Sequence, residues 1–300
     1  MAANASRGIG DRREELIVQR LPELQARIQA LGKLGEVVSA LRTVSAARVQ
    51  QAHAILDAIR EHTEIVRAAL ASAARMAEVP SREGDASAGA GVIIALGSEH
   101  GFVGAFNERV LDVAATQRKP GDVLFVIGAR AALLATERHD SVSWTCQMPS
   151  QVGGVDEVAL HLAARVSLVG GQRRVDRVSL VYTRLTAGAG ARVVTEALLP
   201  FDMQPYRAEE THRPKAISNL DPLPLIDGLV DELLFAQLAH AATESFASEN
   251  AARLGVMQAA IDNVDGKLDD LGRLERELRQ EEITTELLDL VTGAEAVTDA

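Results

Sequence analysis

Apolar residues recur at spacings of three and four along a first long stretch of the sequence, residues 11–79. Such spacing places the apolar side chains on one face of a helix. Before the end of this stretch, proline occurs only at Pro22. The pattern therefore predicts one helix of about 55 to 65 residues, roughly 80–100 Å long at 1.5 Å per residue. Its apolar positions are Leu24, Ile28, Leu31, Leu34, Val38, Leu41, Ile55 and Ile59.

A second stretch of the same kind covers residues 223–292, with Pro224 in its first turn, where proline is tolerated. A compact domain of this size does not cover such a helix alone, so each helix needs a long partner. We expect the two helices to pack against each other as an antiparallel coiled coil. The apolar positions of the second helix are Leu254, Met257, Ile261, Val264, Leu268, Leu271, Leu274, Leu278, Ile283, Leu287 and Leu290.

Residues 91–201 alternate strand-like with helix-like blocks. The blocks GVIIAL, DVLFVIG and SVSWTC are typical of strands, and VDRVSLVYTRL and ARVVTEALLP of a final pair joined by a hairpin. Strands alternating with helices predict βαβ units and a largely parallel sheet. The predicted fold class is thus α/β: a long antiparallel two-helix coiled coil plus a small Rossmann-like domain. Residues 202–222, with three prolines and many polar residues, are interpreted as a linker.

The composition narrows the possible partners. The net charge of −11 disfavours a general nucleic-acid or anionic-membrane surface. The single cysteine, Cys146, cannot form an intrachain disulfide, which suits a reducing compartment. No apolar run approaches the roughly 20 residues that span a bilayer, and the N-terminus lacks the apolar core of a signal peptide. We expect a soluble intracellular chain that meets a membrane only through a partner.

The segment GSEHGFVGAFN, residues 97–107, has three glycines between an apolar run and a helix-like segment, as many phosphate-binding turns do. Its glycine spacing matches neither G-x-G-x-x-G nor the P-loop pattern. The consecutive Ser98, Glu99 and His100 cannot converge on one atom as a catalytic triad does. One cysteine excludes a thiolate zinc site. We therefore predict no catalytic, cofactor or metal site, and periodicity favours a scaffold or interaction role.

Three segments resemble the gamma subunit family of F-type ATP synthases, over nearly the whole chain. ARIQALGKLGEVVSALRTVSAARVQQA is similar to the N-terminal helix of that family. Residues 98–107 resemble its signature S-[DE]-x-G-L-C-G-x-F-N. The C-terminal segment fits at Arg253, Met257, Ala259, Asn263, Arg279, Gln280, Ile283, Thr284, Glu286 and Leu287.

The resemblance implies a central rotor shaft that couples ion flow to ATP synthesis or hydrolysis. The implied partners are the alpha and beta subunits, the epsilon subunit and the membrane ring of c subunits. Nucleotides would bind the alpha/beta hexamer, so the chain itself would be a non-catalytic subunit of a proton- or sodium-transporting ATPase without a cofactor. It would lie peripherally on the cytoplasmic face of the plasma membrane. A nucleotide-dependent enzyme built on the α/β domain is the alternative.

The resemblance also implies which residues contact the beta subunit and which form an apolar bearing. The contacts are Arg42, Arg48, Glu99, His100, Val103, Asn107, Arg279, Gln280, Thr284 and Glu286. The apolar tip comprises Ile283, Leu287, Leu288, Leu290 and Val291. We hypothesise that Arg279 and Gln280 act as a catch.

The sequence departs from the family pattern at four positions. Glu36 and Ser39 replace two usual lysines, His100 replaces an arginine, and Val103 replaces a cysteine. These departures suggest a diverged branch, such as the gamma subunit of a second, sodium-type F-ATPase. The coupling ion stays open, because the ring of c subunits selects it.

Overall fold

The computed structural model describes residues 3–76, 90–172, 175–186, 190–204, 206 and 219–298. The predicted end of the first helix, at residue 79, and most of the predicted linker lie outside these residues. The chain divides into two compact units. Unit 1 comprises residues 1–43 and 257–300, and unit 2 comprises residues 44–256.

Two long helices are present, as the periodicity predicts. Helix α1 is Ala3–Ala74 and helix α6 is Pro222–Thr298. Helix α1 starts before the predicted residue 11 and continues through Pro22. Each helix contributes one segment to unit 1 and another to unit 2.

In unit 1, α1 and α6 form an antiparallel pair. Gln25 Nε2 donates to Glu275 Oε1 at 2.9 Å, and Arg42 Nη1 donates to Gln258 Oε1 at 2.8 Å, so the residue number on α6 falls as that on α1 rises. The less exposed positions of α1 follow the alternating four-and-three spacing of a coiled-coil seam. These positions are Leu24, Ile28, Leu31, Gly35, Val38 and Arg42.

Two apolar positions assigned to the α1 stripe do not belong to this seam. Leu34 and Leu41 are exposed, whereas Gly35 lies at the seam, where a Cβ would come 3.3 Å from Val264 Cγ1. A seam with a strict repeat of seven residues contains Leu31, Gly35 and Val38, so Leu34 lies outside the seam. A small residue here lets the two helices approach closely.

Unit 2 contains a five-stranded sheet in the order β3-β2-β1-β4-β5. All neighbouring strands are parallel except β4 and β5, which are antiparallel, as the sequence predicts. Every residue of β2 is buried, as expected for a parallel strand covered on both faces. The strands are β1 Ala90–Leu96, β2 Val123–Ile127, β3 Val142–Cys146, β4 Val175–Thr186 and β5 Gly190–Leu199.

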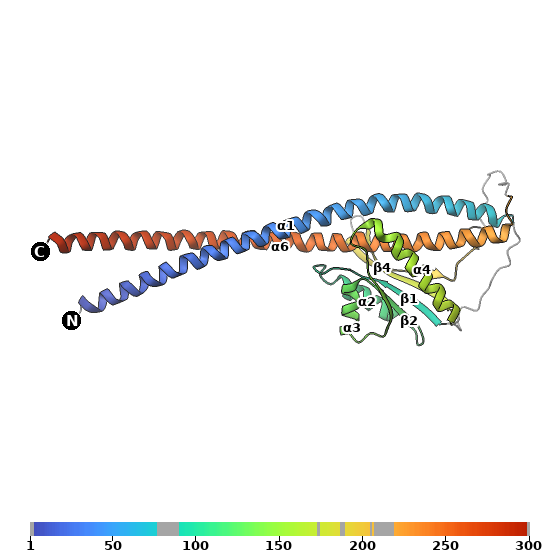
Figure 1. Ribbon diagram of the computed structural model, residues 1–300, viewed down its shortest axis with the longest axis horizontal. Coiled ribbons are helices and arrows are strands. Elements are labelled where there is room, and N and C mark those ends of the chain that lie inside the picture. Colours follow the sequence, from blue (N-terminus) through green and yellow to red (C-terminus); the bar gives the residue numbers. More distant parts are fainter. Residues whose placement is uncertain are drawn as a thin grey trace. The chain divides into compact units, whose positions relative to one another are not determined.

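Helices cover both faces of this sheet. Helices α2 (Phe106–Gln117) and α3 (Ala129–Glu137) pack on one face, around Ile93, Phe106 and Val126. Helix α4 (Val155–Gln172), which follows the short helix η1 (Val152–Gly154), packs on the other face (Figure 1). The unit 2 segments of α1 and α6 share that second face through Ala52, Leu238, Ala242 and Phe246. The unit is therefore a three-layer, Rossmann-like α/β body.

A buried carboxylate fastens one end of the central strands. Asp122, just before β2, accepts hydrogen bonds from the backbone N–H groups of Gly91 and Lys119 at 2.8 and 2.9 Å. Arg177 of β4 forms an ion pair with it at 2.8 Å. Burial alone would raise the pKa of Asp122, but the backbone hydrogen bonds and Arg177 hold that pKa below its ordinary value of 3.8. The ionised carboxylate thus links β1, β2 and β4.

Candidate functional site

The loop between β1 and α2, residues 97–105, crosses the carboxyl end of the sheet close to α3. The backbone N–H of Gly97 donates to the carbonyl of Ile127 at 2.9 Å. A Cβ on Gly97 would lie 2.2 Å from Ala131 Cβ and 2.9 Å from Asn107 Oδ1. Only glycine fits this approach, whereas a Cβ on Gly101 would meet nothing within 4 Å. The loop shape therefore depends on Gly97, which the sequence reading did not single out.

Two expected partner contacts in this loop are buried. Asn107 accepts a hydrogen bond from the Ser98 N–H through Oδ1 and donates to Ser98 Oγ through Nδ2, both at 2.8 Å. The exposed fraction is 4% for Asn107 and 5% for Val103, which packs among the residues under α2. Their side chains hold the loop from inside, which does not fit the expectation that they reach the beta subunit.

The carboxylate of Glu99 is also used inside the chain. Its Oε2 atom accepts hydrogen bonds from the N–H of Ala129 at 2.9 Å and from the N–H of Met148 at 2.8 Å. Ala129 is the first residue of α3, where a negative charge is favoured by the helix dipole. Glu99 therefore ties the β1–α2 loop to α3 and to the segment that follows β3.

Helix α6 holds the same loop through a buried ion pair, Glu249 and Arg253, joined at 2.6 Å. The Glu249 carboxylate accepts from the N–H groups of Glu99 and His100 at 3.2 and 3.4 Å. Arg253 donates to the carbonyls of Gly101 and His100 at 3.1 and 3.2 Å. The family pattern points to Arg253, whereas Glu249 was missed. A Glu and an Arg four residues apart in a segment of small residues were the available signal.

Two serines of α6 occupy backbone acceptors near the carboxyl ends of β1 and β4. Ser245 Oγ donates to the carbonyl of Leu96 at 2.9 Å, and Ser248 Oγ donates to that of Thr183 at 2.8 Å. In Rossmann folds nucleotides bind at the carboxyl ends of the strands where the strand order reverses, here between β1 and β4. Both serines are fully buried, so the chain's own helix takes this position.

The outward side of the loop presents an aromatic residue that the sequence reading missed. Phe102 is 70% exposed and has a φ of 61°, which is uncommon for a residue other than glycine. His100 is also exposed. Beside Phe102 lies an open hollow of about 400 Å³. Its lining comprises Gly101, Phe102, Val103, Gly104, Asn107, Glu108, Arg130 and Leu134.

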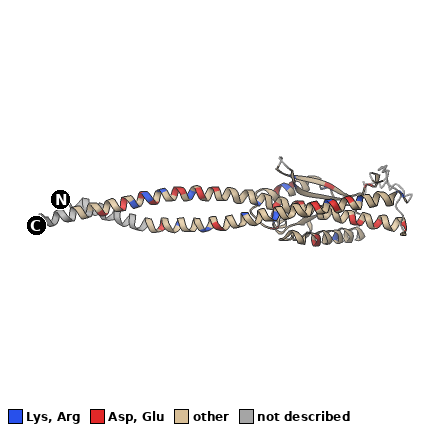
Figure 2. Cartoon of the chain, turned by 90° about the horizontal axis from the view of Figure 1, so that it is seen from above, with Lys and Arg blue, Asp and Glu red and all other residues tan. Residues whose placement is uncertain are grey.

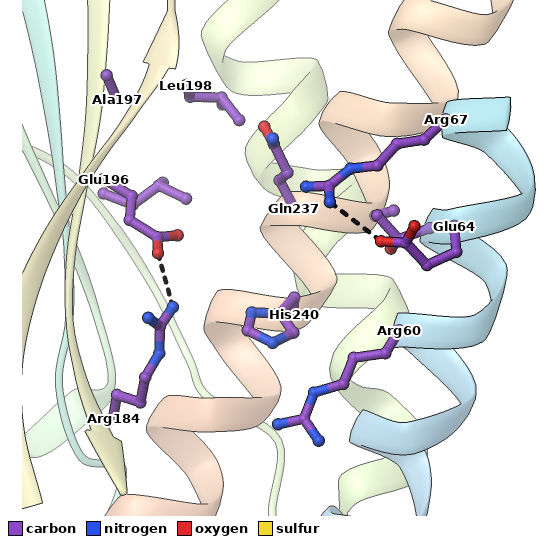
Figure 3. A pocket seen from close by; sticks show the side chains of 12 residues that line it. Arg60, Glu64, Arg67, Arg184, Glu196, Ala197, Leu198, Gln237 and His240 are labelled. Carbon is purple, nitrogen blue, oxygen red and sulfur yellow. Dashed lines mark hydrogen bonds and ion pairs between the residues drawn. The ribbon is translucent and has the colours of Figure 1, made fainter. Parts of the chain in front are cut away.

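A second cavity, of about 410 Å³, lies between α1, α6 and the β4–β5 edge. Figure 3 shows Arg184 and Glu196 on its strand side, Arg60 and Arg67 on α1, and His240 between them. Its charges are paired within the chain, Arg184 with Glu196 at 2.6 Å, Arg67 with Glu64 at 3.1 Å and Arg60 with Asp57 at 3.0 Å. A cavity with compensated charges does not select an anion.

Two titratable groups of α6 are His240, which lines this cavity, and Glu244, 3.8 Å from His240. Burial lowers the pKa of His240, and the nearby Arg184 adds to that effect. Burial raises the pKa of Glu244 against the opposing effect of Arg184 and Arg60. Among the described residues, no group of three or more His, Cys, Asp or Glu side chains is placed to hold a metal ion.

The remaining expected contacts lie on the helices. Arg279 donates to Glu275 Oε1 at 3.1 Å on the same helix, and Thr284 Oγ1 donates to the carbonyl of Gln280 at 2.7 Å. Arg42 is engaged with α6 as described, and Arg48 is partly exposed on α1 in unit 2. Charges of both signs occur along α6 in unit 1 (Figure 2). All five residues of the apolar tip are exposed, namely Ile283, Leu287, Leu288, Leu290 and Val291, with the highest exposed fraction, 70%, at Leu290. Glu286 is also exposed.

A sequence model of the family described as ATP synthase matches residues 20–297. A protein named ATP synthase gamma chain from Mycobacterium sp. (strain KMS) is 26% identical, over 93% of this chain and 98% of the relative. One of the same name from Trichormus variabilis is 29% identical, over 93% of this chain and 99% of the relative.

Solved structures show the same fold. A chain from the rotor of the Euglena gracilis mitochondrial ATP synthase matches with a TM-score of 0.63 and 15% identity, over 88% of this chain and 99% of that one. A chain from the central stalk and c-ring structure of the Tetrahymena thermophila mitochondrial ATP synthase matches with a TM-score of 0.57 and 18% identity, over 75% of this chain and 99% of that one.

Proposed function

Because the chain belongs to the ATP synthase family of gamma chains, we propose that it is the central rotor subunit of an F-type ATP synthase. In this role it couples ion flow through the membrane ring of c subunits to ATP synthesis or hydrolysis on the alpha and beta subunits. The epsilon subunit is its further partner. The relatives named rotor and central stalk support this role through their fold.

The observation that carries the proposal is the exposed apolar end of α6, which follows a charged segment of the helix in unit 1. The apolar tip leaves five large side chains in solvent, which marks a surface made for a protein partner. An apolar surface forms few directional bonds, so it can slide within a cage of subunits as well as push against it. A rotor that touches three catalytic subunits differently biases each towards a different conformation, and only such differential contacts do so.

The chain itself is non-catalytic in this proposal. The buried Ser245 and Ser248 support that reading, because α6 occupies the crevice where a Rossmann enzyme binds its nucleotide. None of the helices described in the structure is long and apolar enough to cross a membrane. We place the chain at the cytoplasmic face of the membrane, attached through its partner subunits.

Arg279 and Gln280 are the proposed catch on a beta subunit. The Arg279 side chain is 57% exposed, and its ion pair in the described part of the chain is with Glu275 of the same helix. Such a surface pair is worth little, so a partner carboxylate can replace it. In the assembled complex, Arg279→Ala/Gln280→Ala is expected to lower ATP hydrolysis and ATP-driven ion transport several-fold. Arg273→Ala is the matched control, since Arg273 forms an exposed pair with Asp270 on the same helix, N-terminal to Arg279.

The test begins with co-expression of the chain with its alpha and beta subunits. A stable complex that contains all three is the expected result. Arg279→Ala/Gln280→Ala complexes that hydrolyse ATP and transport ions as the parent does would refute the catch. Failure of the parent chain to join the complex, together with tight saturable ATP or NAD binding by the isolated chain, would refute the rotor role itself.

A further inference from the structure

The ion pair between Glu249 and Arg253 is unusual because both side chains are buried, with side-chain exposures of 3% and 7%. Taking two charges out of water costs more than their attraction returns unless further hydrogen bonds satisfy them. Here those bonds go to the backbone of three consecutive residues of the β1–α2 loop, Glu99, His100 and Gly101. The pair therefore holds the loop whatever side chains the loop carries.

The chemistry of the two side chains is matched to the groups they meet. A carboxylate only accepts hydrogen bonds and meets two N–H donors, and a guanidinium only donates and meets two carbonyls. An exposed pair spaced by four residues supports its own helix weakly. The Glu249–Arg253 pair instead joins two parts of the chain that are about 150 residues apart in sequence, as the separation of its hydrogen-bonded partners shows.

The rest of the α6 surface in unit 2 packs on the sheet through apolar contacts. These contacts combine small side chains, such as Ala242 and Ala247, with larger ones, such as Leu238 and Phe246. Apolar contacts oppose separation but are not directional. Directional bonds therefore add to the resistance of the helix against rotating or slipping on the body. The buried Glu249 and Arg253 provide four such bonds to the loop, beside the two serine bonds already described.

We propose that Glu249 and Arg253 are positioning residues that fasten the β1–α2 loop to α6, so that the body and the helix turn together under load. The loop passes the constraint onward, because Glu99 ties it to α3 and Asn107 ties it to the start of α2. The inference rests on the proposed rotor function and adds to it the point at which torque crosses from helix to body. Without the fastening, ATP is hydrolysed while less rotation reaches the ring.

The decisive variant exchanges the two charges, Glu249→Arg/Arg253→Glu. It keeps a pair spaced by four residues but presents donors to the loop N–H groups and an acceptor to the loop carbonyls. Glu249→Gln is the milder variant, which keeps the size of the side chain and one acceptor oxygen. Exchange of an exposed pair on the same helix, Asp270→Arg/Arg273→Asp, is the control for charge exchange as such.

Two measurements test the proposal. The first is amide hydrogen–deuterium exchange of the loop in the full chain. The variant with swapped charges is expected to raise the rate of amide exchange about tenfold or more, because hydrogen bonds to charged groups are lost. The second is ion transport per ATP hydrolysed in the assembled complex, expected to fall several-fold in the exchanged variant and less in Glu249→Gln. Leu70→Ala, a buried site away from the loop, controls for lost stability.

The outcomes separate the two proposals. If the amide exchange rate of the loop is the same in the charge-swapped variant as in the parent, the fastening is refuted. If the loop exchanges faster but ion transport per ATP equals that of the parent, the role of the fastening in coupling is refuted. A fall of the same size in Leu70→Ala would also overturn that role, because stability alone would then explain it. A parent chain that does not assemble or couple refutes the rotor function, while the exchange measurement on the isolated chain still reports on the fastening.

Discussion

Replacing Gly97 by alanine is expected to destabilise unit 2 through one steric contact. The added methyl group would lie 2.2 Å from Ala131 Cβ, where carbon atoms prefer a separation of about 3.5–4.0 Å. Neither Cβ atom can turn away, because each is fixed to its backbone. Relief therefore requires movement of the β1–α2 loop or of α3, and both are held by hydrogen bonds that the Glu99 and Asn107 side chains accept from the backbone.

Overpacking of a well-packed site costs typically about 1–3 kcal/mol. The contact at Gly97 belongs at the upper end, since the new methyl group also approaches Asn107 Oδ1 to 2.9 Å and disturbs its hydrogen bond to Ser98. A loss of about 3 kcal/mol in the free energy of unfolding lowers the melting temperature of a domain of this size by about 6–12 °C. Gly101→Ala is the matched control, expected to change stability by less than about 0.5 kcal/mol.

The assay is thermal and urea unfolding of the full chain. A second variant, Gly97→Ala/Ala131→Gly, removes the facing methyl group and is expected to recover most of the loss, less about 1 kcal/mol for glycine in a helix. Non-additivity in this double-mutant cycle is the signature of a direct contact. Equal melting temperatures for Gly97→Ala and Gly101→Ala, or strict additivity in the cycle, would refute the steric reasoning.

Three further outcomes follow from the described contacts. Asp122→Asn should cost about 2–3 kcal/mol at neutral pH through lost hydrogen bonds to a charged group; urea unfolding at several pH values would check it. Because the pKa of Asp122 is lowered on folding, the stability it contributes is present above about pH 4 and is lost on acidification through the folded pKa. The variant should therefore lose less stability than the parent below pH 4, and an equally steep loss would contradict this. Phe106→Ala should cost about 3–5 kcal/mol, because the ring is fully buried; a midpoint unchanged in urea would contradict it. Leu287→Gln should leave the free energy of unfolding within about 0.5 kcal/mol of the parent, because the side chain is exposed, yet lower ion transport per ATP in the complex; parent-like transport would remove Leu287 from the proposed bearing.

The sequence alone determines the elements and their pairing, because the signals for them are local. The spacing of apolar residues at three and four predicts both long helices, and the apolar blocks GVIIAL and DVLFVIG predict strands. The alternation of these blocks predicts the parallel sheet with its antiparallel edge. The sequence predicts the ends of the helices less accurately, since α1 begins at Ala3 rather than at residue 11 and continues through Pro22.

The tertiary structure alone decides what the polar residues of the β1–α2 loop do. From the sequence, Glu99 and Asn107 are predicted to be surface contacts, because a polar residue in a loop is usually solvated. Their hydrogen-bond partners, and the hold that Glu249 exerts on the loop, come from segments that lie up to about 150 residues away. The register of the helix pair is decided in the same way, because a seam exists only between two helices. Leu34 and Gly35 are neighbours in the sequence, and only the facing Val264 determines that the glycine belongs inside and the leucine outside.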